Sequence, residues 1–510
     1  MPTGYVGAPE GAAAPAEPAE LSAWWEQFRD PELQSLITRA FESNLDLRTA
    51  ASRIREARQQ EVIAGAREFP NVNVSALGAA MHSRSNPFGS LGGNGGSDGA
   101  ANGNAGTGAN GSTGAGPGAV GGAESSGASS GTGTGPGSGA GAASTGDTAA
   151  ESSGASSGGT GGGQTLKLFS AGFDATWELD LFGGTRRAIE AAKAATDAAV
   201  WQLRDGQVSL SAEIAVDYLT LCATRTRIRV INESLQRQQQ QLEITDARRR
   251  FGFVTELDVN QARAQLALTT AQLPSLEAEA RALTHALAVL LGQQPDAMAN
   301  ELAKATSIPA TPPVMPLGLP SDLLRRRPDI RQAERRLAAS TAQVGVAVAA
   351  LYPSFDLLGA ANYAGNSIDG LISPRHFSTV GAGIIRWPIF QAGASRANVQ
   401  AREEERQQAY LAYQKSVLGA LQDAEDSLAR LDAEQHRLGS LLDAETAARS
   451  TLDIARSQYR NGLVGFINVL SAETTLLDVE NELAQSRAAL AQSLVSVYKA
   501  LGGGWRVEPR

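Results

Sequence analysis

Side chains that could do chemistry are few in this 510-residue sequence, and they do not converge on one place. Cys222 is the only cysteine. A single thiol can form neither an intrachain disulfide nor a cysteine metal cluster, so we interpret it as a buried small side chain within a helix. We find no Ser/His/Asp spacing and no nucleotide-binding loop. The four histidines are scattered without the spacing of metal ligands: His82, His285, His376 and His436. The sequence therefore predicts no enzyme, no bound metal and no cofactor.

Three acidic residues stand at even-numbered positions in the stretch SAGFDATWELDLFGG, residues 170–184. From Lys167 onward the odd positions are mostly apolar, whereas the even positions include Asp174, Glu178 and Asp180. This period of two predicts a β-strand with one apolar and one acidic face. The acids lie along one face and do not surround a common point. A strand needs only about 9 to 11 residues to cross a membrane as part of a β-barrel.

The composition argues against several other classes of protein. The net charge of -9 disfavours nucleic acid or an anionic lipid surface as the main partner. The sequence lacks the run of about 18 apolar residues that marks a transmembrane helix. The first 20 residues lack the basic and apolar regions of a secretion signal.

Residues 84–165 consist almost entirely of Gly, Ser, Ala, Thr and Asn. Their few apolar side chains cannot offset the entropy of ordering, so we predict a disordered external loop. A phosphate-binding glycine loop would end in Gly-Lys-Ser/Thr directly before a helix, and neither feature follows. We expect three other irregular segments: an extended amino-terminal segment at 1–30, a linker at 293–319 and a tail at 503–510.

The remainder of the chain is an internal duplication. One offset superposes Gly252 on Gly462 and Gly292 on Gly502, and another superposes Phe69-Pro70 on Tyr352-Pro353. Each half reads as helix, strand, loop, strand and a long helical hairpin with heptad columns. Pro274 predicts a kink in the first hairpin. The first repeat covers 31–292, with strands at about 71–81 and 166–181 and a hairpin at 184–292. The second covers 320–502, with strands at about 354–364 and 377–389 and a hairpin at 393–502.

Four strands per chain cannot close a membrane barrel, because single-chain barrels begin at eight strands. An open sheet in lipid would leave backbone groups unpaired, so several chains would have to share one barrel. The alternative is a soluble sheet packed on the helices. The heptad columns likewise fit either a helical tube that continues the pore or an ordinary coiled coil.

Four stretches in this order resemble the TolC-like outer-membrane factors of tripartite efflux pumps, most closely the NodT-type lipoprotein branch that serves resistance-nodulation-division transporters. They are WWEQFRDPELQSLITRAFESNLDLRTA, FDATWELDLFGGTRRA, LPSDLLRRRPDIRQAERRLAAS with ALYPSF, and YRNGLVGFINVLSAETTLLDVENELAQSRAALAQSLVSVYKALGGGW. Together they span nearly the whole chain outside the Gly-rich insertion.

The resemblance implies a mainly α fold with a small membrane β-barrel. Three chains would form a homotrimer whose shared twelve-stranded outer-membrane barrel continues into a periplasmic α-helical barrel of coiled-coil hairpins. The expected location is the outer membrane of a Gram-negative bacterium, in contact with its lipid and extending into the periplasm. The expected partners are a periplasmic adaptor protein and an inner-membrane resistance-nodulation-division transporter.

The resemblance also implies two sets of site residues. The hairpin tips that would face the adaptor contain Gly252, Val254, Gly462 and Val464, although any helical hairpin needs a glycine turn. Just past the tips, the positions where the family narrows its pore are Leu257, Asp258, Gln261, Ile467, Asn468 and Ser471. Asp258 would supply an anionic ring, and the alternative is an acid that stabilises the first turn of a helix.

The sequence departs from the family in two respects. Relatives often carry acids at the positions of Asn468 and Ser471, so a strongly charged gate on the second hairpin is not expected. The lipoprotein branch also carries a lipidated cysteine before a segment like GYVGAPEG, and no cysteine precedes that segment in this sequence. Either the chain begins downstream of the signal or it is an unlipidated variant.

The function that the resemblance implies is a passive exit duct for drugs and other small toxic compounds across the periplasm and outer membrane. Two alternatives stay open at this point. The same fold could export polypeptides in type I secretion, or the chain could be a coiled-coil scaffold without a transport function.

Overall fold

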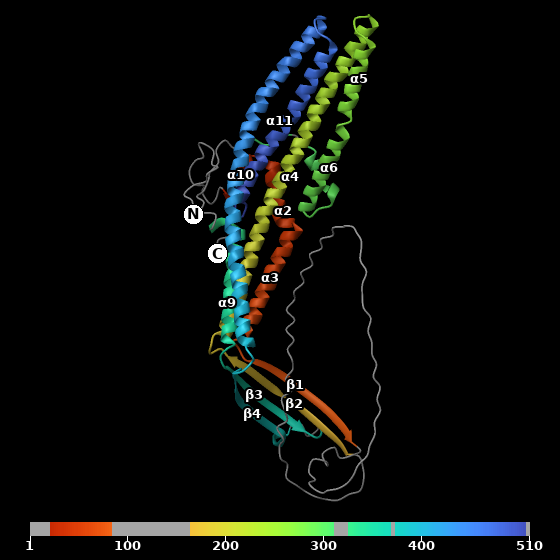
Figure 1. Cartoon of the computed structure of the whole chain (residues 1–510). Helices are drawn as coiled ribbons and strands as arrows, with labels where there is room; N and C mark the ends of the chain where they lie inside the picture. The colour runs from red at the N-terminus through yellow and green to blue at the C-terminus, as the bar shows by residue number, and fades with distance from the viewer. Residues whose placement is uncertain (1–20, 84–163, 306, 311–324, 369–372, 506–510) are drawn as a thin grey trace, which may run out of the picture. The chain divides into compact units, whose positions relative to one another are not determined.

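The computed structural model describes residues 21–83, 164–305, 307–310, 325–368 and 373–505 (Figure 1). They form two compact units: a helical unit of residues 21–74, 173–361 and 379–505, and a strand-end unit of residues 75–83, 164–172, 362–368 and 373–378 within the described ranges. The predicted loop 84–165 lies outside the described residues except for its last two positions. Most of the predicted segment 1–30 and parts of the 293–319 linker and the 503–510 tail also lie outside them.

The first repeat contains two short helices, two strands and a long hairpin. A 3-10 turn, η1 (Trp24–Phe28), precedes α2 (Pro31–Ser43) and α3 (Leu45–Ala66). Strands β1 (Asn71–Ser83) and β2 (Gln164–Leu179) lead to α4 (Gly184–Arg250), α5 (Glu256–Thr270) and α6 (Leu273–Leu290). The chain then makes η2 (Pro295–Met298) and α7 (Ala299–Leu302). The return arm of the hairpin is interrupted at Ala271 and Gln272, just before Pro274, where the sequence predicts a kink. Pro274 lacks an N–H group and clashes with the preceding turn, so the arm is divided into two helices.

The second repeat follows the same order. It contains α9 (Pro328–Ala349), β3 (Ser354–Gly365), a short η3 (Pro374–His376), β4 (Phe377–Arg386), α10 (Ala394–Arg460) and α11 (Phe466–Ala500). The strands make one sheet in the order β1-β2-β3-β4. Strand β4 stops at Arg386, before the predicted end at 389, and Pro388 in that interval cannot donate a ladder hydrogen bond.

In the helical unit, α10 packs along α11 and α9, and α4 packs along α9, α3 and α11 (Figure 1). The main core joins the two ends of the described chain. Trp24 stacks on Tyr498 with ring centroids 5.5 Å apart, and the Gly504 N–H donates to the Leu21 carbonyl at 2.9 Å. Cys222 is fully buried in the same core, and burial raises the pKa of its thiol to about 12. No helix within the described ranges combines the length and apolarity that crossing a membrane requires.

Each repeat closes with the same joint. In the first repeat the joint is made by Asn44 and Leu290. The offset of 283 residues places Arg327 at the position of Asn44, and the offset of 210 residues places Ala500 at the position of Leu290. Asn44 Nδ2 donates to the Leu290 carbonyl at 2.8 Å, and Arg327 Nη1 donates to the Ala500 carbonyl at 3.1 Å. Equivalent positions are therefore joined in both repeats, through a neutral amide in the first and a charged guanidinium in the second.

A second duplicated contact lies where the helices meet the strands. The indole N–H of Trp177 donates to the Glu68 carbonyl at 3.0 Å, and the indole N–H of Trp387 donates to the Leu351 carbonyl at 3.2 Å. The two pairs are related by the same two offsets. Each bond satisfies a carbonyl near the end of a helix, which would otherwise need another partner.

Candidate functional site: the hairpin tips

The two hairpin bends have the same backbone geometry. Gly252 and Gly462 adopt φ values of 76° and 73°, which side chains rarely tolerate. In the first bend the Phe253 N–H donates to the Arg248 carbonyl at 3.0 Å, and in the second the Leu463 N–H donates to the Gln458 carbonyl at 2.9 Å. These bonds satisfy carbonyls at the end of each long helix. The glycines are thus required by the turn itself.

Large apolar side chains project from the tips into solvent. Phe251, Phe253 and Leu463 are 78%, 73% and 72% exposed. Val254 and Val464, which the family resemblance predicts at the adaptor-facing bend, are half-buried and pack against the core beneath the tips. We did not single out the three exposed side chains from sequence, although their position beside the turn glycines was an available signal. An exposed apolar group of this kind is typical of an interaction surface.

The six residues predicted to form the constriction are three pairs of repeat-equivalent positions on the first two turns of α5 and α11. In the first pair, Leu257 is 65% and Ile467 56% exposed. The second pair is Asp258, which is half-buried, and Asn468, which is exposed. The third pair is Gln261 and Ser471. All six therefore lie on the helix starts directly behind the two tips.

Asp258 has a structural role in its own helix. Its Oδ2 accepts hydrogen bonds from the backbone N–H and the hydroxyl of Thr255, both at 2.9 Å. This is a helix-start cap of the kind that stabilises a first turn. Asn468, at the equivalent position, donates from Nδ2 to the Gly465 carbonyl at 3.3 Å. The first hairpin alone thus carries a carboxylate at this level of the tips.

Arg248 connects the ends of the two long helices. Its Nη1 donates to the Tyr459 carbonyl at 2.8 Å, and its guanidinium lies 4.8 Å from the centroid of the Tyr459 ring. A cation over an aromatic face adds an attraction of roughly 0.5–2 kcal/mol to the hydrogen bond. The first hairpin is therefore fastened to the second just below the bends.

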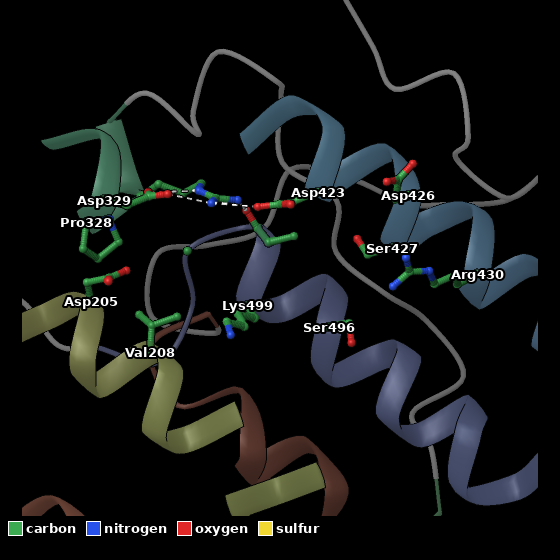
Figure 2. A pocket seen from close by; sticks show the side chains of 13 residues that line it. Asp205, Val208, Pro328, Asp329, Asp423, Asp426, Ser427, Arg430, Ser496 and Lys499 are labelled. Carbon is green, nitrogen blue, oxygen red and sulfur yellow. Dashed lines mark hydrogen bonds and ion pairs between the residues drawn. The ribbon is translucent and has the colours of Figure 1, made fainter. Parts of the chain in front are cut away.

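A cavity of about 260 Å³ lies next to the charged joint of the second repeat (Figure 2). Arg327 forms ion pairs with Asp329 at 2.7 Å and Asp423 at 3.0 Å. Burial lowers the pKa of Arg327, but the bonds and charges of these two aspartates outweigh it and leave the pKa raised. Burial raises the pKa of Asp205, and the charge of Asp329 raises it further. The cavity belongs to the joint between α4, α9, α10 and α11.

Within the part of the chain that the structure describes, no three His, Cys, Asp or Glu side chains gather closely enough to hold a metal ion.

The repeated order of strand pair and long hairpin is the fold of a known family of channels. A family model described as outer membrane efflux protein matches residues 141–293 and 319–503. The chain belongs to this family. It is 29% identical over 496 residues to the pyoverdine export outer membrane protein OpmQ of Pseudomonas aeruginosa, covering 97% of this chain and 90% of the relative. It is 31% identical over 334 residues to nodulation protein T of Rhizobium leguminosarum bv. trifolii, covering 65% of this chain and 70% of the relative.

A solved structure agrees with the sequence comparison. The outer-membrane channel OprN superposes with a TM-score of 0.77 at 30% sequence identity, covering 98% of both chains. The fold is that of trimeric outer-membrane channels in which a β-barrel continues into an α-helical barrel, so the predicted fold class is confirmed.

The chain is an outer-membrane channel component of a tripartite efflux pump, located in the outer membrane and extending into the periplasm. The resemblance to TolC-like factors of the NodT branch is confirmed. Members of the family are transport channels and work with an adaptor and an inner-membrane transporter. The predicted site residues remain predictions, as do the predicted domain limits.

Proposed function

We propose that three copies of this chain form a passive exit duct for drugs and other small toxic compounds. The observation that carries the proposal is the similarity to OpmQ over nearly the full length of both chains, including both repeats. Other relatives are named for the efflux of cations and of toluene. These names share small cargo, and none of them refers to a polypeptide.

The exposed apolar tips are the proposed docking surface for a periplasmic adaptor. Phe251, Phe253 and Leu463 come from both hairpins and flank Gly252 and Gly462. Their burial against a partner would stabilise the complex by about 25 cal/mol per Å² of apolar surface removed from water. Phe253→Gln should therefore weaken adaptor binding. Leu268→Gln is the matched control, because Leu268 is 64% exposed on α5 but lies away from the bend.

The paired positions behind the tips are the proposed constriction. Leu257 and Ile467 would supply its apolar part, with Gln261 and Ser471 behind them. Asp258 would place a ring of three carboxylates in the trimer. Such a ring attracts cations and repels anions along the passage.

The experiment is single-channel recording from the purified channel in planar bilayers, together with drug-resistance assays in an efflux-deficient host. Asp258→Asn keeps an oxygen acceptor for the Thr255 N–H while removing the charge. We expect it to reduce cation preference and to raise conductance or drug leakage. Asn468→Asp, at the repeat-equivalent position, should increase cation preference. Unchanged currents in both variants would contradict the proposal that these positions form the constriction. Failure of the parent chain to restore resistance with any adaptor and transporter would contradict the proposed function as an exit duct.

A further inference from the structure

The cavity of about 260 Å³ at the second-repeat joint has more charged side chains on its wall than the joint uses (Figure 2). The ion pairs of Arg327 with Asp329 and Asp423 account for three of the seven charged residues that line it. The volume lies below the roughly 300–1,000 Å³ of sites for drug-sized ligands. A molecule held in this cavity would therefore be smaller than a drug.

The other four charged residues come from three helices: Asp205 of α4, Asp426 and Arg430 of α10, and Lys499 of α11. None of them forms an ion pair with another residue of the described ranges. Asp426 and Arg430 are four residues apart on one helix, a spacing at which opposite charges commonly pair. Asp426 instead accepts a hydrogen bond from Gln422 at 3.4 Å, and Figure 2 shows its carboxylate pointing away from the Arg430 guanidinium. Arg430 is thus left to the cavity.

The first repeat shows whether a joint of this kind needs these charges. The offset of 210 residues gives uncharged side chains at the equivalent positions: Val216 for Asp426, Thr220 for Arg430, Ala286 for Ser496 and Val289 for Lys499. The first-repeat joint nevertheless forms, because Asn44 donates to the Leu290 carbonyl there. The charges of Arg430 and Lys499 are therefore not required to join the helices.

Asp205 is an ionisable group in an unfavourable position. Burial raises the pKa of its carboxyl and the charge of Asp329 raises it further, whereas the charges of Arg327 and Lys499 lower it. Lys499 thus acts on Asp205 from nearby, but the two are not in an ion pair within the part of the chain that the structure describes. Ionisable groups with shifted pKa values gather at functional sites. The cavity therefore presents a carboxylate and an ammonium group that do not neutralise each other by contact.

The charged groups of the wall have complementary binding preferences. The Arg430 guanidinium and the Lys499 ammonium can donate to a carboxylate, and the Asp205 carboxylate can accept from an ammonium group. Two hydroxyls add further acceptors. Ser427 donates to the Ala424 carbonyl at 2.9 Å and Ser496 to the Gln492 carbonyl at 2.9 Å, which leaves the lone pairs of both oxygens for a ligand.

The rest of the wall includes an apolar part. Val208 and Ala500 are 5% and 4% exposed, and Pro328 is also buried. These side chains could pack against a short aliphatic group and remove it from water. The wall thus combines both signs of charge with an apolar surface, all within a small volume.

We propose that the cavity at the second-repeat joint binds a small zwitterion, an α-amino acid with an aliphatic side chain. Its carboxylate lies at Arg430 and Lys499, its ammonium group lies at Asp205, and its side chain lies against Val208 and Ala500. The same chemistry could come from a free amino acid or from the end of a peptide. A free amino acid presents both charges on one carbon, whereas each end of a peptide presents only one. The site lies away from the hairpin tips and goes beyond the proposed function.

Isothermal titration calorimetry of the purified full-length channel in detergent tests the binding. The probes are L-alanine and L-leucine, with N-acetyl-L-leucine and L-leucinamide as derivatives that keep only the carboxylate or only the ammonium group. At least one of the two amino acids should bind with a dissociation constant of about 1 mM or below. Both derivatives should bind at least about tenfold more weakly than leucine, because each loses one set of charge-assisted hydrogen bonds. Absence of binding by alanine and leucine below about 10 mM would overturn the proposal. Equal binding of leucine and either derivative would also overturn it and would favour a peptide end.

Substitutions assign the two charged ends of the ligand to the wall. Arg430→Thr with Lys499→Val introduces the residues of the equivalent first-repeat positions, so the joint should still form, and amino-acid binding should fall at least about tenfold. Asp205→Asn should weaken the binding of the amino acid and leave that of N-acetyl-L-leucine unchanged. The matched control, Arg406→Thr, alters an exposed arginine of α10 that does not line the cavity and should change neither.

A purely structural role for the charges has a different result. Lys499 lies in the last turn of α11, where a cation stabilises the helix end. If that were its whole role, the double variant would lower the denaturation midpoint and keep the parent's affinity for the amino acid, which would overturn the proposal. If the double variant failed to fold, Asp205→Asn alone would decide, and unchanged affinity in that variant would overturn the proposal. Binding is measured without transport, so its failure leaves the proposed exit duct untouched.

Discussion

Arg327→Ala should lower the free energy of unfolding by about 3 kcal/mol, because this side chain holds three elements of the second-repeat joint. It binds Asp329 through two bonds of 3.1 and 2.7 Å, Asp423 through one of 3.0 Å and the Ala500 carbonyl through one of 3.1 Å. The side chain of Arg327 is 11% exposed, whereas those of Asp329 and Asp423 are 33% and 59% exposed.

The exposures determine how the energy is divided. Hydrogen bonds to charged groups contribute about 1.5–3 kcal/mol each when they are shielded from water, which applies best to the pair with Asp329. An ion pair with a largely exposed partner contributes about 0–1 kcal/mol, which applies to Asp423. The expected loss in the free energy of unfolding is smaller than the sum of the contributions of the separate bonds, because water can reach Asp329 after the arginine is removed.

The measurement is chemical denaturation of the purified channel in detergent, followed by far-ultraviolet circular dichroism. Asp423→Asn is the matched variant, since it removes only the exposed partner and should cost at most about 1 kcal/mol. The reasoning would be refuted if Asp423→Asn destabilised the protein as much as Arg327→Ala, because the joint would then act as one unit that exposure does not divide.

Three further predictions concern the same joint and its neighbours. Asp205→Asn should stabilise the protein at neutral pH. The raised pKa of Asp205 means that the folded state binds the proton more readily than the unfolded state, so the stability of the parent protein falls as pH rises. The difference in denaturation midpoint between variant and parent should therefore shrink as pH falls toward about 4. Gly502→Ala should cost about 1–3 kcal/mol in the same assay, because Gly502 has φ of 74° and a Cβ would lie 3.1 Å from backbone atoms of Arg327; a neutral result would mean that the joint relaxes. Trp387→Phe should cost about 1 kcal/mol by loss of the bond to the Leu351 carbonyl, and an unchanged midpoint would show that water replaces the indole.

The repeat structure could be predicted from sequence because glycines and prolines mark positions where the backbone has special requirements. Gly252 and Gly462 fixed both bends, and both have the left-handed conformation that the turn needs. The strand starts followed from Pro70 and Pro353. The predicted ends of the strands were less accurate. β2 stops at Leu179, two residues before the predicted end, since the alternation of apolar and polar residues in the sequence continues beyond the paired backbone.

Heptad columns predicted the packing of the long helices only in part. In the column that runs from Val200 to Leu242 at intervals of seven residues, Ile214 and Leu221 are fully buried but Leu235 and Leu242 are half-buried, whereas the polar Gln238, Gln241 and Thr245 beside them are buried. α4 contacts α3, α5, α6, α9 and α11, so more than one of its faces is covered along its length. A periodicity rule assumes one apolar face and therefore misses polar residues that are enclosed by several neighbours.

The joints were hidden for a related reason. The offset that superposes Asp46 on Asp329 also superposes Asn44 on Arg327, but these two residue types share no obvious chemistry. Only the structure shows that they donate to repeat-equivalent carbonyls, those of Leu290 and Ala500, in the hairpin that follows each of them. The sequence could reveal equivalent positions, whereas the partner of each side chain depends on contacts made more than 170 residues away.

The burial of Cys222 has a practical consequence for following the hairpins in motion. It is the sole thiol of the sequence, it is enclosed in the core, and its raised pKa keeps it protonated. Maleimide and methanethiosulfonate reagents should therefore not react with it. A cysteine introduced at an exposed tip position such as Phe253 or Leu463 would then be the single reactive site in the chain. The natural sequence can thus serve as its own background for fluorescent and spin labels, without first removing a native residue.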